Sequence, residues 1–207
     1  IRPGEVVRDY LNGKTIPYTN PFRYAVLGVA ISAFIFLGLK LWEIQTEGVI
    51  ATYRQYGLVD SVEEEVRMRK IFSYVYKFMN VLPLLLLPFT AFSSRMFFGK
   101  KKMNYAEYFI VNAYLLGQST LYGIPTFVFF YFLPHLVNTP LPFVLTILVA
   151  GILYGQIFKV LSENNFWSAL GLGIATYIVG YLFFIIFSMI VGVFIGIGFA
   201  IVMKSTL

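Results

Sequence analysis

The polar side chains that interrupt the apolar segments are the residues with the most potential for chemistry. If residues 104–122 form a helix, Glu107 and Gln118 fall on one stripe and Asn112 falls on the adjoining stripe. Polar groups inside a membrane are costly and often functional, so this side predicts a cavity for a lipid headgroup, an ion or a small solute. The candidate cavity residues are Lys77, Asn80, Glu107, Asn112, Gln118 and Gln156.

The second interpretation is that these polar side chains form hydrogen bonds between neighbouring, packed helices. Such bonds are typically worth about 0.6–2 kcal/mol each inside a membrane. Asn104 and Glu107 have the spacing of a capping box, in which the glutamate only closes the start of its helix. We favour this second interpretation, and the cavity is the alternative.

Motifs for catalysis or metal binding are absent from the sequence. There is no HExxH or GxSxG motif, no Gly-rich phosphate loop before a helix, and no pair of aspartates within the apolar segments. The chain has no Cys, and its single His135 lacks neighbouring acidic residues, so a zinc site is not expected. We therefore predict a non-enzymatic protein without a metal or cofactor.

The composition indicates an integral membrane protein. Of the 207 residues 58% are hydrophobic and only 13% are charged, against about 25% charged in a soluble domain. The mean hydropathy is +0.76. The alternating ten-residue segments of a membrane β-barrel do not occur. The sequence therefore predicts an all-α, polytopic transmembrane helix bundle, whose net charge of +6 reflects basic loops rather than nucleic-acid binding.

Long apolar runs divide the chain into a transmembrane domain of about five spans. We expect this domain to cover residues 21–207, with spans at about 21–42, 71–92, 105–133, 143–161 and 167–203. Pro83 and Pro88 should kink the second span, and Pro125 should bend the third. The last run is long for one upright crossing, but it has no polar turn, so we favour one long helix over two.

Residues 1–20 predict an amphipathic juxtamembrane segment. Pro3 suits a first helical turn, Gly13 suits a helix end, and the apolar residues between them share one face. That face comprises Val6, Val7, Tyr10 and Leu11. A helix this short is marginal in water, so we expect it to lie in the headgroup region with its apolar face in the acyl boundary. A helix that docks a protein partner is the alternative.

Basic residues flank the first span and follow the second. The predicted lipid-headgroup contacts are Arg2, Arg8, Lys14, Arg95, Lys100, Lys101 and Lys102. This distribution places the N-terminus in the cytoplasm and the C-terminus on the outer side. The loop at residues 43–70 also carries basic residues, but acidic residues accompany them.

Small residues recur at every fourth position near the end of the last apolar run. The stripe comprises Ser188, Gly192, Gly196 and Ala200. Small residues at this spacing let another helix approach closely. The partner helix is either another span of this chain or a span of another subunit.

The opening RPGEVVRDYLNGK, the following NPFRY and the later MNYAEYFIVNAYL resemble a bacterial family of multi-pass membrane proteins known only as a domain of unknown function. The resemblance extends to about Gln118. The resemblance implies a location in a bacterial inner membrane, but it does not indicate an activity. In that family a Cys-rich zinc ribbon often precedes the arginine-proline-glycine motif. The chain contains no Cys, so that segment is either outside this chain or absent. The chain also lacks an initiator Met, so we expect it to be an internal portion of a longer protein.

Together these observations predict a membrane-embedded subunit or scaffold. Its partners would be membrane lipids and a further protein chain or a second copy of itself, but not nucleic acid. The alternative is a small transporter or lipid-translocating protein that uses the polar stripe of the third span.

Overall fold

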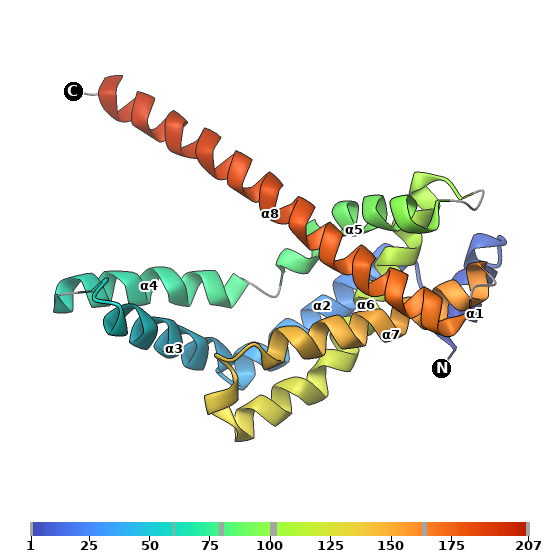
Figure 1. Cartoon of the computed structure of the whole chain (residues 1–207), viewed down its shortest axis with the longest axis horizontal. Helices are drawn as coiled ribbons and strands as arrows, with labels where there is room; N and C mark the ends of the chain where they lie inside the picture. Colours follow the sequence, from blue (N-terminus) through green and yellow to red (C-terminus); the bar gives the residue numbers. More distant parts are fainter. Residues whose placement is uncertain (1, 60, 79–80, 100–102, 163–164, 206–207) are drawn as a thin grey trace.

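A computed structural model describes residues 2–59, 61–78, 81–99, 103–162 and 165–205, with side chains of the last helix described as far as residue 192. This described part is all-helical and contains no strand. Its elements are α1 (Pro3–Leu11), α2 (Pro21–Gly38), α3 (Leu41–Gln55), α4 (Val62–Phe78), α5 (Leu82–Phe98), α6 (Tyr105–Phe132), the 3-10 turn η1 (Pro134–Leu136), α7 (Leu141–Ser162) and α8 (Phe166–Ser205) (Figure 1).

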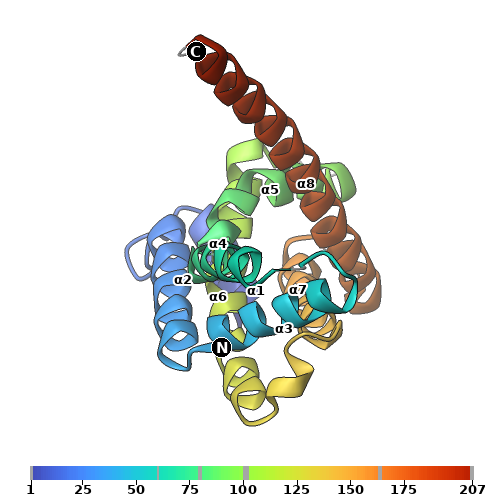
Figure 2. The same cartoon turned by 90° about the vertical axis from the view of Figure 1, so that its left-hand side faces the viewer.

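The helices alternate in direction along one long axis of the molecule. From the end that carries α1, helices α2, α6 and α8 run toward the opposite end, and α5 and α7 run back (Figure 1). Helix α6 packs against α2, α5 and α7, and α8 packs against α5 and α7 (Figures 1 and 2). Helices α3 and α4 form a hairpin at the opposite end.

Within the described ranges, three helices are long and apolar enough to cross a membrane, namely Pro21–Gly38, Leu141–Leu161 and Phe166–Gly192. A fourth crossing results if α4 and α5, which are inclined by 58° to each other, form one bent span. Helix α6 has the expected length, but polar residues such as Asn112 and Gln118 lower its hydropathy. Five spans therefore remain a prediction.

The first span ends earlier than the sequence analysis predicted. Helix α2 stops at Gly38, and Lys40 adopts a left-handed backbone conformation with φ 54° before α3 begins at Leu41. A left-handed residue cannot continue a right-handed helix. Trp42 consequently belongs to α3, and the polar segment expected at residues 43–70 is mostly a pair of helices.

The second predicted span, residues 71–92, is two helices rather than one kinked helix. Helix α4 ends at Phe78, and Pro83 lies in the first turn of α5, where its missing N–H costs nothing. Pro88 lies inside α5 without ending it. Helix α5 continues to Phe98, so Arg95 lies in its last turn rather than in a loop.

The predicted third and fourth spans agree with α6 and α7 to within two residues. The capping box is confirmed, because Asn104 accepts from the N–H of Glu107 at 3.0 Å and the Glu107 carboxylate accepts from the N–H of Asn104 at 2.7 Å. The final apolar run is one helix, as favoured. Beyond its contacts with α5 and α7, α8 extends away from the bundle (Figures 1 and 2).

Helix α1 forms at the predicted position, but protein covers its apolar face. It packs against α7 and α6, and Val7 is only 1% exposed. Placing Val7 in the acyl boundary was therefore wrong, because the cleft beside α6 and α7 already buries this side chain. Gly13, with φ 89°, lies just beyond the end of the helix.

The hydroxyl of Tyr18 donates to Asp9 at 3.2 Å, and partial burial together with this bond raises the pKa of Tyr18 above its ordinary value.

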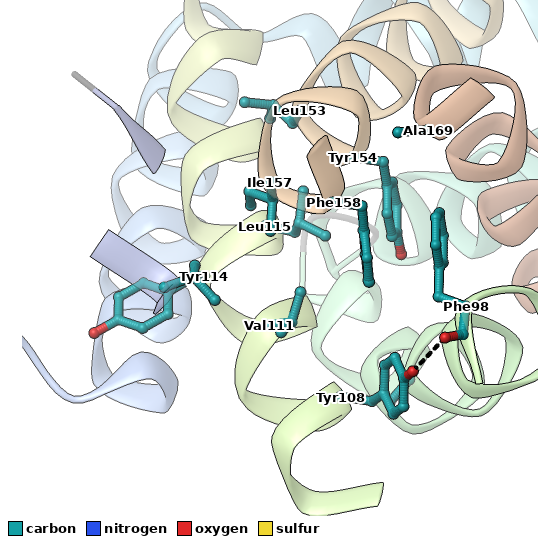
Figure 3. Close-up of a cluster of buried hydrophobic side chains, with 12 residues drawn as sticks. Phe98, Tyr108, Val111, Tyr114, Leu115, Leu153, Tyr154, Ile157, Phe158 and Ala169 are labelled. Carbon is teal, nitrogen blue, oxygen red and sulfur yellow. Dashed lines mark hydrogen bonds between the residues drawn. The ribbon is translucent and has the colours of Figure 1, made fainter. Parts of the chain in front are cut away.

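The main core lies where α5, α6 and α7 meet near α1. Figure 3 shows nearly parallel aromatic rings there. The rings of Phe98 and Phe158 stack with centroids 3.7 Å apart, and Tyr154 continues the stack at 5.9 Å from Phe158. The hydroxyl of Tyr108 donates to the carbonyl of Phe98 at 2.9 Å, so this polar atom is satisfied within the core.

Candidate functional site

A buried hydrogen-bond network centres on Asn112, whose side chain is 2% exposed. Its Nδ2 donates to Ser94 Oγ at 2.9 Å and to the carbonyl of Tyr108 at 2.8 Å. Its Oδ1 accepts from the hydroxyl of Tyr154 at 2.5 Å. One amide thus joins α5, α6 and α7, and its donors and acceptor are all used within the protein.

A second polar group connects α6 to the N-terminal segment. The hydroxyl of Tyr114 donates to the carbonyl of Thr19 at 2.7 Å, and the Tyr114 ring meets Tyr10 of α1 edge-on at 5.6 Å. Figure 3 shows Tyr114 pointing away from the other core side chains. One turn further along α6, Gln118 accepts from the hydroxyl of Tyr24 at 2.7 Å. These bonds fix the chain at the point where it turns from α1 into α2.

Glycines allow the N-terminal helices to approach the bundle at backbone distance. A Cβ atom at Gly4 would lie 2.7 Å from Val160 Cγ2 and 2.8 Å from the carbonyl oxygen of Gln156 on α7. A Cβ atom at Gly28 would lie 2.7 Å from the carbonyl oxygen of Gly117 on α6. No side chain fits at Gly4 or Gly28 without moving a helix.

The predicted cavity residues do not come together around one space. Asn112 and Gln118 lie on different sides of α6, and Glu107 caps the start of that helix. Lys77 lies elsewhere, with its ammonium group 4.1 Å from the centre of the Trp42 ring. Gln156 is exposed on α7. Asn80 lies outside the described residues.

Two adjoining cavities lie along α6 instead. The smaller has a volume of about 40 Å³ and is lined by Asn112 and Tyr154. The larger, about 320 Å³, runs beside the second half of α6, with walls from α2, α3, α5, α7 and α8. The two share a wall that comprises Pro83, Leu86, Leu116, Ser119, Ala150 and Tyr177.

The predicted headgroup contacts that the structure describes are all exposed. Arg2 pairs with Glu5 at 3.2 Å, and Lys14 pairs with Asp9 at 3.5 Å. Arg8 lies on α1, and Arg95 is at the end of α5 that faces the same end of the molecule (Figure 1). Lys100, Lys101 and Lys102 lie outside the described residues.

The described half of the packing stripe predicted on α8 is not buried within this chain. Ser188 and Gly192 are exposed, and a Cβ atom at Gly192 would meet nothing within 4 Å. Gly196 and Ala200 lie beyond residue 192, where the description of burial on α8 ends. A stripe that is buried in the bundle lies on α2, where Ala25, Gly28 and Ser32 are all buried. The spacing of these small residues is a sequence signal that the sequence analysis missed.

Over the part of the chain that the structure describes, these features define an all-helical fold with three helices long and apolar enough to cross a membrane. Residues 1–33 match a family described as "Protein of unknown function (DUF3667)". The match covers α1, the turn after it and most of α2, including Gly4 and Gly28. It supports the resemblance to a domain of unknown function over this stretch, which is shorter than the expected extent to Gln118. No curated protein and no solved structure matches the chain.

Proposed function

We propose that the chain is a non-enzymatic integral protein of the bacterial inner membrane that acts as a membrane-embedded subunit or scaffold. The observation that carries this proposal is the use of the polar groups on α6. Asn112 bonds to α5 and α7, and Gln118 bonds to α2, so both amides hold helices together. Such bonds stabilise a fixed arrangement of helices rather than exposing polar groups to a solute.

The orientation that we propose has five crossings, with the N-terminus in the cytoplasm and the C-terminus on the outer side. Figure 1 supports it, since α1, the end of α5 and the start of α8 share one end of the molecule. Exposed basic residues of that end are Arg2, Arg8, Lys14, Arg23, Arg95 and Lys159. At the opposite end, acidic residues of α3 and α4 accompany the basic ones, and Arg69 pairs with Glu47 and Glu65. Excess basic charge is typical of the cytoplasmic side.

The part of α8 around Ser188 and Gly192 supports a contact with a second copy of this chain. It is apolar, extends past the bundle and has small residues at helix-packing spacing. We expect the protein to purify as a homo-oligomer in mild detergent. The double variant Ser188→Leu with Gly192→Leu should raise the dissociation constant of this oligomer at least tenfold. Ser168→Leu with Gly171→Leu, at exposed positions near the start of α8, is the control. A monomer in several detergents, with no other protein bound, would contradict the proposal.

A small transporter or lipid-translocating protein is the second candidate function. The observation that favours it is that the 40 Å³ and 320 Å³ cavities lie side by side along α6 and share six lining residues. Replacing Asn112 and Gln118 together by Leu separates the two functions. The double variant loses the bonds of both amides, and therefore stability, in either case. A translocator would also lose flux per folded protein in proteoliposomes, whereas for a scaffold the change is confined to stability.

A further inference from the structure

The geometry points to a binding site for a neutral, single-chain lipid with a hydroxylated head in the 320 Å³ cavity. Volume is the first argument. A cavity of roughly 150 Å³ lined by Leu, Ile and Phe accepts benzene. Benzene has six carbons, so a cavity of about twice that volume holds a chain of about twelve carbons. The space lies within the range of about 300–1,000 Å³ that is usual for ligand pockets.

The shape of the cavity favours a chain over a compact molecule. Its wall on α6 runs from Leu116 to Phe130, which is about 21 Å at 1.5 Å per residue. Opposite this wall lie Phe36 on α2 and Leu145 on α7. These positions give the cavity an elongated, mostly apolar lining.

The lining also excludes a charged head. None of the described residues around the cavity is Asp, Glu, Lys, Arg or His. A buried carboxylate or phosphate without a partner charge costs several kcal/mol or more. Fatty acids and phospholipid headgroups are therefore poor occupants, and an uncharged head is required.

Gln45 on α3 supplies the polar contact. It lines the cavity at the end near Leu41 and Val137, and its Oε1 is buried without a hydrogen-bond donor. A buried acceptor without a donor is costly in a native protein. A hydroxyl group of the lipid would satisfy it once the terminal amide turns toward the cavity.

The hydroxyl groups along the walls are consistent with this assignment. Ser119 and Thr120 donate to the carbonyl of Leu116 at 3.0 Å, and Thr146 donates to that of Pro142 at 2.9 Å. Their hydrogens are used within their own helices, so these walls behave as weakly polar surface beside an acyl chain. Ser32, Thr126 and Tyr177 also place hydroxyl groups on the walls. We place the hydroxylated head at Gln45 because its Oε1 is buried without a donor.

Trp42 provides a reporter beside the site. It packs against the cluster of Phe36, Leu41, Phe130 and Val137, all of which line the cavity. The chain contains two Trp residues, so Trp167→Phe leaves Trp42 as the only one. The purified chain in nanodiscs of saturated phosphatidylcholine is titrated with 6,7-dibromododecanoyl glycerol, whose bromines quench Trp fluorescence. Saturable quenching is the expected result.

Gly123 offers a variant that fills the cavity. It lines the space, and a Cβ atom there would meet nothing within 4 Å, so the side chain of Gly123→Leu has room to start and should extend into the cavity. We expect it to weaken binding at least tenfold. Gly171→Leu, also at a helical glycine with open space around it, should bind as the parent does. Equal binding by both variants, or quenching that does not saturate, would overturn the proposal.

Gln45→Leu tests the head of the ligand separately. Loss of one buried hydrogen bond should weaken binding of the brominated monoacylglycerol about tenfold. Binding of 6,7-dibromododecane should change less than about twofold, since it has no hydroxyl group. Equal saturable quenching by a brominated phosphatidylcholine would show that any bilayer acyl chain enters, and this would overturn the assignment to a neutral lipid.

Discussion

Replacement of Asn112 by Leu is expected to lower the free energy of unfolding by about 2–4 kcal/mol, because buried polar groups that lose their partners cost about 1–3 kcal/mol each. The hydroxyls of Ser94 and Tyr154 would both lose the amide that they contact. The substitution keeps the size of the side chain, so packing changes contribute little. The measurement is SDS-induced unfolding of the purified protein in bicelles.

Gln156→Leu is the matched control, because it removes an amide that is exposed on α7. Its effect should stay within about 0.5 kcal/mol, as is usual for surface substitutions. A double-mutant cycle of Asn112→Leu with Tyr154→Phe should give a coupling energy of about 1 kcal/mol, because the two side chains share one bond. If Asn112→Leu costs no more than Gln156→Leu, Asn112 does not hold the helices together.

Gly4→Leu is expected to displace α1 from α7. Even a Cβ atom would lie 2.8 Å from the carbonyl oxygen of Gln156, which cannot move without moving the helix. We expect a loss of about 2–4 kcal/mol, since the buried Val7 leaves the core together with its neighbours. The chain has no Cys, so Val7→Cys gives a local readout. The thiol should resist a maleimide in the parent and react quickly when Gly4 is Leu.

The control is Gly38→Leu, since a Cβ atom at Gly38 would meet nothing within 4 Å. It should leave the thiol at position 7 protected. The comparison of Gly4→Leu with Gly38→Leu also distinguishes an α1 that packs against α7 from an α1 that lies only on the membrane surface. An interfacial α1 would gain apolar surface from Leu at position 4 and bind the membrane more tightly. Unchanged protection of the thiol would contradict the contact between α1 and α7.

Local signals predicted helices better than they predicted contacts. Pro3, Gly13 and the capping box at Asn104 mark helix ends correctly, because these signals act through the backbone of neighbouring residues. The amphipathic pattern of α1 indicated a buried face, but it did not distinguish lipid from protein as the cover. Burial of Val7 depends on α6 and α7, which lie about 100 residues or more away in the sequence.

The breaks within the predicted spans could not be found by apolar length alone. Lys40 carries a left-handed backbone that is uncommon for Lys, and nothing in its neighbours signals it. The polar stripe of α6 was found, yet its members face different helices. Periodicity gives the side of one helix on which Asn112 and Gln118 lie, but not the partner that each meets. The cavity beside Gly123 arises from six helices together, so no local pattern predicts it.

The proposed membrane crossings can be measured directly, because the chain contains no Cys. Single substitutions to Cys at exposed residues of both ends are labelled in spheroplasts with a membrane-impermeant maleimide. Lys14→Cys and Asn165→Cys should react only after the membrane is permeabilised. Tyr56→Cys and Thr139→Cys should react in intact spheroplasts, because α2 and α7 connect the two ends. Labelling of Lys14→Cys and Tyr56→Cys from the same side would contradict a crossing by α2 and with it the proposed topology.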